Sequence, residues 1–365
     1  MLYFLMRALE EAGGPAVFRY VTSRSALAFI TGFVCVLIVG RPLINWLYRR
    51  GYRSFERTYG DINTTAKTGT PIMGGLLMAL GGLGAAFLWC DLTNPFVWVL
   101  FAAAVYFAGF GLLDDWLKIR HRNPDRGLSR PVKLASQILF GLGLGLFLAW
   151  PDITPFPHQV GTQLQIPFLK GAALDLRLGI LAWSAFYIAY HVNAVNITDG
   201  MDGLATVPAI LVFAVVATFA YIAGNVQLSA HYLYAFIPRS SEITVFCAAI
   251  IGAGLGFLWY VCHPASVFLG DTGSLFIGGV LGTAALMIRQ ELVCLIAGLV
   301  FMLELLSTFV QEQIGFRLLQ RRILPRAPLH HALQHRGMAE SKIVVRFWIV
   351  SLICAAFAIT TIKFR

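Results

Sequence analysis

Three acidic clusters stand at the ends of long apolar runs in a chain that is otherwise poor in charge. They are Asp114-Asp115, the stretch Asn196–Gly203 with Asp199 and Asp202, and Asp271 in the sequence Gly-Asp-Thr-Gly-Ser. A carboxylate costs roughly 2.5–3.5 kcal/mol at the centre of a membrane helix. Carboxylates beside hydrocarbon are therefore typical of a site that binds a cation or a polar substrate.

The sequence Asp114-Asp115-Trp-Leu-Lys118 has the spacing of a helix end. On a helix, Lys118 lies four positions after Asp114 and three after Asp115, so its ammonium group can reach either carboxylate. We interpret the pair as a Mg²⁺ ligand beside a base or nucleophile, because hard oxygen ligands suit Mg²⁺. A solvated helix end with an ordinary ion pair is the alternative.

Asp271 precedes an apolar run in a turn that also contains Gly270, Gly273 and Ser274. Glycines allow a ligand to approach the backbone, and the N–H groups at the start of a helix favour phosphate. Helix capping by Asp271 or Ser274 is the alternative. A second glycine-rich acidic stretch, Asp199–Gly203, strengthens the prediction of a cation or phosphate site.

Paired histidines, His330-His331, follow Pro328 in a strongly basic stretch. Such a pair can bind a metal or a phosphate, or act as acid or base near neutral pH, and an exposed basic loop is the alternative. A zinc hydrolase is not predicted, because the chain has no His-Glu-x-x-His pattern. Glu304 lies inside an apolar run, and we interpret it as a buried, hydrogen-bonded side chain that supports the site.

The elements that position these residues are predicted to be membrane-spanning helices. Hydrophobic residues make up 58% of the 365 positions and charged residues 13%, which excludes an ordinary soluble domain. Apolar runs of about 17–25 residues can cross a bilayer. The predicted spans are 24–46, 72–90, 95–113, 132–150, 178–194, 204–222, 243–260, 273–288, 291–314 and 344–362. We predict one polytopic all-α integral membrane domain, residues 1–365, with about ten transmembrane helices.

The net charge of +10 is concentrated in alternate links between these spans. Lys and Arg are abundant in the links after the first, third and ninth spans and sparse in the even-numbered links. By the positive-inside rule the odd-numbered links face the cytoplasm, and both chain termini are then extracytoplasmic. Nucleic acid is not a predicted partner, since the charge is explained by topology in the lipid bilayer and by an anionic substrate.

Every polar cluster described above falls in an odd-numbered link or at its edge, so the predicted active site faces the cytoplasm. A secondary transporter, the competing class, would place its charges near the midplane and often shows inverted repeats. The one-sided placement favours an enzyme at the membrane surface. The six cysteines show no CxxC pattern, so neither disulfides nor a zinc site is predicted.

The order of the motifs resembles that of the phospho-N-acetylmuramoyl-pentapeptide-transferase family, within the polyprenyl-phosphate N-acetylhexosamine-1-phosphate transferase superfamily. The matching stretches run in family order along almost the whole chain. They are Lys67–Gly75, Gly111–Lys118, Gly127–Ser129 with Lys133, Asn193–Ala205, Val267–Ser274, Arg326–His331 and Val345–Ile349. The resemblance implies a ten-helix membrane fold, a homodimer and a place in the bacterial inner membrane.

The resemblance also implies a reaction. UDP-N-acetylmuramoyl-pentapeptide would give its phospho-sugar to undecaprenyl phosphate, forming lipid I for peptidoglycan synthesis and releasing UMP, with Mg²⁺ as cofactor and Mn²⁺ as a substitute. Asp271 and Asp115 would share the metal, and Asp114 and Asp115 would position or deprotonate the lipid phosphate. The other implied roles are phosphate binding by Lys118 and Lys133, a nucleotide pocket from Lys67, Asn196, Asp199 and Asp202, and His330 and His331 at the pyrophosphate or sugar end.

Three positions depart from the family pattern. The chain has Thr64 and Ala332 where the family usually has histidine, and Val261 where it usually has asparagine. The sequence His330-His331-Ala-Leu also resembles relatives that transfer N-acetylglucosamine-1-phosphate. A UDP-N-acetylglucosamine:polyprenyl-phosphate transferase is therefore the alternative function, and a non-catalytic relative is a further one.

Overall fold

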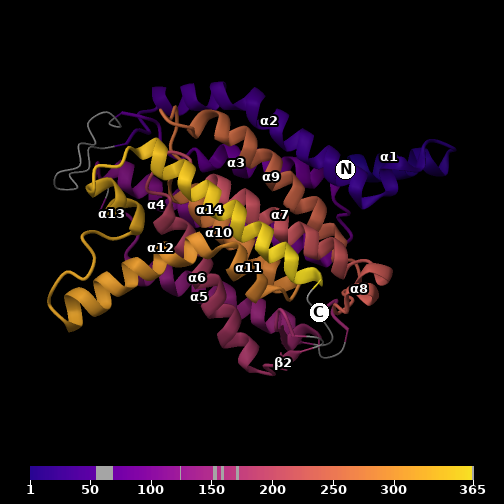
Figure 1. Cartoon of the computed structure of the whole chain (residues 1–365). Helices are drawn as coiled ribbons and strands as arrows, with labels where there is room; N and C mark the ends of the chain where they lie inside the picture. Colours follow the sequence, from indigo (N-terminus) through magenta and orange to yellow (C-terminus); the bar gives the residue numbers. More distant parts are fainter. Residues whose placement is uncertain (55–68, 124, 151–153, 158–159, 170–171, 364–365) are drawn as a thin grey trace.

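The structure is a computed structural model, and it describes residues 1–54, 69–123, 125–150, 154–157, 160–169 and 172–363 (Figure 1). Most of these residues are helical. The α-helices are α1 (Leu2–Glu11), α2 (Val21–Arg49), α3 (Gly75–Trp89), α4 (Pro95–Arg120), α5 (Arg130–Ala149), α6 (Gly179–Thr198), α7 (Thr206–Ala223), α8 (Val226–Tyr232), α9 (Ser241–Val261), α10 (Gly270–Met287), α11 (Glu291–Ala297), α12 (Leu299–Phe309), α13 (Leu329–His335) and α14 (Glu340–Thr360).

The remaining elements are short. A π-helix, Val310–Leu318, continues α12, and 3-10 helices cover Ala16–Arg19, Val160–Thr162 and Thr361–Lys363. Strands β1 (Gln163–Gln165) and β2 (Ala173–Asp175) pair antiparallel, with Leu164 opposite Leu174. This two-stranded ribbon lies in the stretch between α5 and α6.

The prediction of an all-α membrane protein is confirmed at the level of the helices. Seven helices in the described part of the chain are long and apolar enough to cross a membrane, and α3 is a shorter apolar helix. Each predicted span overlaps a helix, although the predicted range 291–314 is divided at Gly298 between α11 and α12. The predicted link Asn196–Gly203 also begins later than expected, because α6 continues to Thr198.

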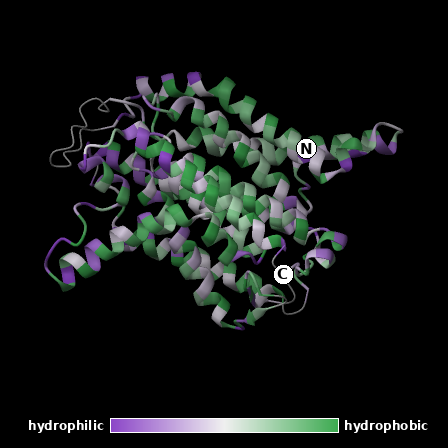
Figure 2. Ribbon diagram, in the orientation of Figure 1, coloured by the Kyte–Doolittle hydropathy of each residue, from purple (hydrophilic) through white to green (hydrophobic). Residues whose placement is uncertain are grey.

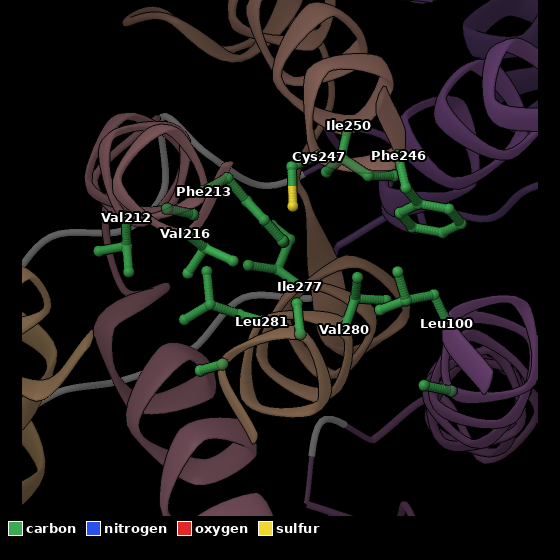
Figure 3. Packing of buried hydrophobic residues seen from close by; sticks show 14 of the residues in the cluster. Leu100, Val212, Phe213, Val216, Phe246, Cys247, Ile250, Ile277, Val280 and Leu281 are labelled. Atoms are coloured by element: carbon green, nitrogen blue, oxygen red, sulfur yellow. The ribbon is translucent and has the colours of Figure 1, made fainter. Parts of the chain in front are cut away.

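Helix α10 lies at the centre of the bundle and is buried from Thr272 to Met287. Figure 3 shows Ile277, Val280 and Leu281 of α10 between the apolar side chains of α7, α9 and α4. Small residues permit this close packing, as they do in membrane helices generally. At Gly111 of α4, an added Cβ would lie 2.2 Å from the carbonyl oxygen of Asp271. The two acidic helix ends can therefore lie against each other.

The outer surface of the bundle is apolar over its middle. Large side chains such as Ile38, Leu139 and Trp259 are more than half exposed, and Figure 2 shows hydrophobic residues along the central part of the helices with hydrophilic residues toward the ends. Such a surface is explained by contact with lipid, because a soluble protein rarely exposes a continuous apolar belt. Both chain termini lie near one end of the bundle, and α13 lies at the other (Figure 1).

Candidate active site at the ends of α4 and α10

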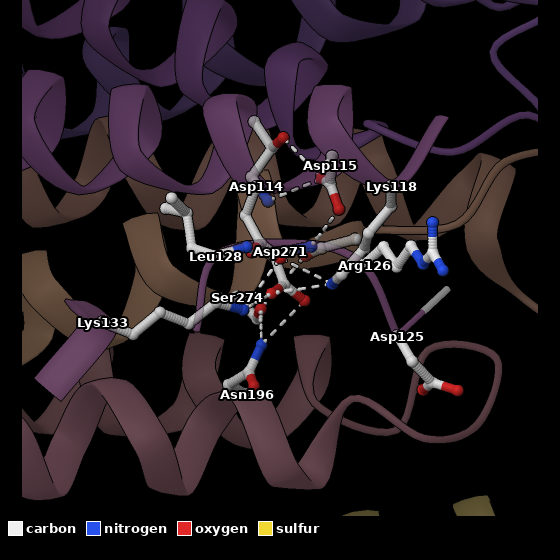
Figure 4. Close-up of polar contacts among 12 residues, drawn as sticks. Asp114, Asp115, Lys118, Asp125, Arg126, Leu128, Lys133, Asn196, Asp271 and Ser274 are labelled. Atoms are coloured by element: carbon white, nitrogen blue, oxygen red, sulfur yellow. Dashed lines mark hydrogen bonds and ion pairs between the residues drawn. The ribbon is translucent and has the colours of Figure 1, made fainter. Parts of the chain in front are cut away.

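Two lysines join the carboxylates of Asp114 and Asp271 (Figure 4). The Nζ atom of Lys118 lies 2.6 Å from Oδ2 of Asp114 and 3.0 Å from Oδ2 of Asp271. The Nζ atom of Lys133, on α5, lies 2.8 Å from Oδ2 of Asp114 and contacts the same oxygen of Asp271. Asp114 is fully buried, whereas the lysine and Asp271 side chains are partly exposed. The sequence spacing allows Lys118 to reach either Asp114 or Asp115, and the structure pairs it with Asp114.

Asp115 points to a different neighbour. Its carboxylate accepts hydrogen bonds from the backbone N–H groups of Asp271 (3.1 Å) and Thr272 (2.9 Å) and from the Thr272 hydroxyl (2.7 Å). These are first-turn groups of α10, which a helix leaves unpaired. Gly270, with φ +72°, allows this approach, because an added Cβ would lie 2.7 Å from Oδ2 of Asp115. The start of α10 is therefore capped by a carboxylate of α4 rather than by its own Asp271 or Ser274.

Asn196, in the last turn of α6, connects a third helix to the cluster. Its side-chain amide donates to Oδ1 of Asp271 at 3.1 Å and to the hydroxyl of Ser274 at 2.8 Å. The loop before α5 also contributes, since the N–H of Leu128 donates to Oδ1 of Asp114 at 2.6 Å. Side chains of α4, α5, α6 and α10 thus form the cluster. The carboxylates of Asp114 and Asp271 are each oriented by more than one partner.

The cluster fits a divalent cation by its chemistry and its charge. One oxygen from each of Asp114, Asp115 and Asp271 lies within 4.8 Å of the others. Hard carboxylate oxygens are the ligands that Mg²⁺ prefers. Three carboxylates beside the ammonium groups of Lys118 and Lys133 leave one net negative charge, which attracts a cation and repels a phosphate. A divalent cation would reverse that sign.

A second polar group surrounds the turn after α6. The Oδ2 atom of buried Asp202 lies 2.9 Å from Nδ1 of His263, and the Asp202 backbone N–H donates to Oε1 of Glu340 at 3.0 Å. Asp202, His263 and Glu340 also form a group with metal-ligand spacing. His263 and Glu340 could not be identified from the sequence, because His263 has no acidic neighbour in the chain and Glu340 is placed as an ordinary acidic residue at a helix start.

The paired histidines lie beside the same turn. His330 is buried and contacts Glu304 of α12 through its ring and its backbone. An added Cβ on Gly200 would lie 2.2 Å from Nε2 of His330. His331 is only partly buried, and its Nδ1 lies 3.3 Å from Oε1 of Gln334. The interpretation of Glu304 as a buried, hydrogen-bonded side chain is confirmed, and its support of the site stays a prediction.

The predicted site residues therefore fall into two groups. Asp114, Lys118, Lys133, Asn196 and Asp271 are in direct contact, and Asp115 joins them through the backbone of α10. Asp202 and His330 lie with the turn after α6, which also carries Asp199. Lys67 and the departure Thr64 lie outside the described residues.

These features define a class of protein: a helical membrane protein with a carboxylate and lysine site at one end of an apolar bundle. Residues 97–289 match the sequence model of Glycosyl transferase family 4, a range that contains both acidic helix ends. The chain is also 40% identical, over its full length and that of the relative, to the phospho-N-acetylmuramoyl-pentapeptide-transferase of Maridesulfovibrio salexigens. The chain belongs to the phospho-N-acetylmuramoyl-pentapeptide-transferase family.

Proposed function

We propose that the protein transfers phospho-N-acetylmuramoyl-pentapeptide from its UDP conjugate to undecaprenyl phosphate, giving lipid I and UMP. The observation that carries the proposal is the bridging of Asp114 and Asp271 by Lys118 and Lys133, in a chain 40% identical over its full length to an enzyme of that name. One phosphoanhydride bond is broken and one is made, so the step is close to isoenergetic and needs no ATP.

The barrier to this reaction is the approach of two anions, and the site can lower it. Lys118 and Lys133 already contact carboxylate oxygens, and each ammonium can exchange such a contact for an oxygen of a phosphate. Asp114 holds both lysines in place, and Asn196 orients Asp271. The residues of the chain therefore position the phosphates before reaction, which is the main protein contribution to phosphoryl transfer.

We infer that Asp271 and Asp115 hold a Mg²⁺ ion, for which Mn²⁺ can substitute. Oδ1 of Asp271 accepts a hydrogen bond from Asn196, and Oδ1 of Asp115 accepts one from the Asp271 N–H. A carboxylate oxygen has a second lone pair available for a ligand. When bound, the ion would neutralise phosphate charge and stabilise the departing UMP.

We further propose that ten helices span the membrane, that the site faces the cytoplasm and that both termini lie outside. The positive-inside rule supports this orientation, and a cytoplasmic site at the bilayer surface is where a soluble nucleotide sugar can meet a lipid phosphate.

The residues that would serve the donor are Lys67, Asp199, Asp202, His330 and His331. The departures Val261 and Ala332 are buried residues of α9 and α13. A homodimer is expected from the family.

Isotope exchange tests this proposal. Purified protein, Mg²⁺ and lipid I should move labelled UMP into UDP-N-acetylmuramoyl-pentapeptide, and excess chelator should stop the exchange until Mg²⁺ or Mn²⁺ is restored. Asp271→Asn should abolish exchange while the protein still folds, because the amide removes one anionic ligand. An active Asp271→Asn variant would overturn the metal assignment. Release of UMP from UDP-N-acetylglucosamine when undecaprenyl phosphate is the acceptor, with no release from the muramoyl donor, would overturn the choice of donor.

A further inference from the structure

Glu304 is a fully buried carboxylate whose two oxygens both contact one residue. Oε1 accepts a hydrogen bond from the backbone N–H of His330 at 3.1 Å, and Oε2 lies 3.0 Å from Nδ1 of the same residue. Glu304 and His330 are 0% and 1% exposed. Burying a carboxylate without such partners costs several kcal/mol of free energy. This double contact fixes both the start of α13 and the plane of the imidazole ring.

The other nitrogen of the ring faces the turn after α6. Nε2 of His330 is buried and has no hydrogen-bond partner within the described part of the chain. Gly200 lies against this nitrogen in space, since an added Cβ on Gly200 would be 2.2 Å from Nε2. Gly200 follows Asp199 and precedes Asp202 by two positions. The ring therefore packs against the backbone that carries both acidic residues of this turn.

We propose that Glu304 is a positioning residue that acts through His330 on the Asp199-Gly200 turn, and that it determines how tightly the UDP donor binds. Because Nδ1 faces a carboxylate, it carries the proton, and Nε2 is left directed at the turn. The inference rests on the proposed function, in which this turn serves the donor. Loss of Glu304 weakens donor binding and leaves the lysine-bridged carboxylates in place.

A double-mutant cycle tests whether Glu304 acts through His330. Glu304→Gln should raise the donor KM about tenfold or more, the size of a lost hydrogen bond to a charged group, with a smaller change in kcat. The same substitution should have little further effect in a His330→Ala background, because residues that act as one unit are not additive. An equally large rise in KM with and without the His330 side chain would overturn the proposal.

The glycine gives an independent test from the opposite side of the ring. Gly200→Ala should raise the donor KM, since its methyl group would collide with Nε2. In the His330→Ala background this methyl group has space, so the added alanine should cause no further loss. If Gly200→Ala is harmless in the wild type, the contact between the ring and the turn has no effect on the donor, and the proposal fails.

Two controls separate this inference from folding and from the proposed function. Glu242→Gln removes a buried carboxylate that pairs with Arg24, far along the chain from α13, and should lower the melting temperature without raising the donor KM. Calorimetric binding of UDP-N-acetylmuramoyl-pentapeptide repeats the cycle without turnover. If the wild type binds this donor but gives no exchange, the proposed function fails, and the binding cycle still decides the role of Glu304.

Discussion

Asp115 and Thr272 are 157 positions apart in the sequence, yet their side chains meet at the start of α10. The Thr272 hydroxyl donates to Oδ2 of Asp115 at 2.7 Å, and the Thr272 N–H donates to the same oxygen at 2.9 Å. Both residues are almost completely buried. The contact joins α4 to α10 at the residue next to Asp271. The position of Asp271, one of the two proposed metal ligands, therefore depends on this contact.

The first prediction concerns this hydroxyl. Thr272→Val keeps the shape of the side chain but leaves Oδ2 of Asp115 with one donor fewer, and we expect a loss of about 1–3 kcal/mol in the free energy of unfolding. The exchange of UMP should also slow, because α10 positions Asp271. Thr272→Ser retains the hydroxyl and is the matched control. Equal stability and exchange in the valine and serine variants would contradict the role of the contact.

A second prediction follows from the charge of the cluster. Lys133→Met removes one of two ammonium groups that bridge Asp114 and Asp271, so the net charge becomes more negative by one. We expect Mg²⁺ to bind severalfold more tightly and the KM for undecaprenyl phosphate to rise, because one substitution strengthens cation binding and weakens anion binding. Titration of exchange activity with Mg²⁺ at several lipid concentrations measures both quantities.

Arg130→Met is the control for the lysine variant. Arg130 is exposed and pairs with Glu312 at 3.2 Å, and exposed pairs contribute little to stability. This variant removes the same charge close to Lys133 in the sequence without touching the cluster. A change in the Mg²⁺ requirement as large as that of Lys133→Met would mean that general surface charge, and not the bridging position, sets the affinity.

The sequence predicted the carboxylate cluster well where the pattern was local. The helical spacing predicted that Lys118 reaches Asp114 or Asp115, and it pairs with Asp114; the hydropathy of the chain predicted the helices. The separate role of Asp115 was not predictable. Adjacent helix positions point about 100° apart, which indicates that two carboxylates have different neighbours but does not identify them. Only the packing of α4 on α10 shows that Asp115 caps a helix.

The second polar group was only partly predictable, for a related reason. Asp202 could be identified as a candidate from the sequence, because it lies in a glycine-rich turn after a predicted helix. Its partners His263 and Glu340 come from the stretch after α9 and from the start of α14. No periodicity connects three such segments. The packing of Met201 and Leu204 with Ile343 and Val344 joins two of them, the turn after α6 and the start of α14.

A third prediction concerns stability at the end of the bundle that lies away from the site. Arg24 and Glu242 form a bidentate pair with both side chains almost completely buried, and Glu242 also accepts from the Asp91 N–H at 2.9 Å. Glu242→Ala should cost about 3–5 kcal/mol of unfolding free energy, because it leaves a buried guanidinium without its partner. Arg24→Met with Glu242→Leu should recover much of this loss. If the single variant unfolds like the wild type, the pair is not buried in the membrane-embedded protein.

The last prediction tests the sidedness on which the proposed reaction depends. Asp125 is an exposed residue between α4 and α5, and Figure 4 shows its side chain directed away from Asp271. Ala173 is exposed in β2, in the next link along the chain. Because consecutive links lie on opposite sides of the membrane, cysteines at these two positions should label from opposite sides.

The native Cys262 is exposed and would add background labelling, so both cysteine variants should be made in a chain that carries Cys262→Ser. An impermeant thiol reagent applied to intact cells should label Ala173→Cys and leave Asp125→Cys unmodified until the membrane is opened. The opposite pattern would place the carboxylate cluster outside, where no cytoplasmic UDP-sugar could reach it, and the proposed function would fail together with the topology.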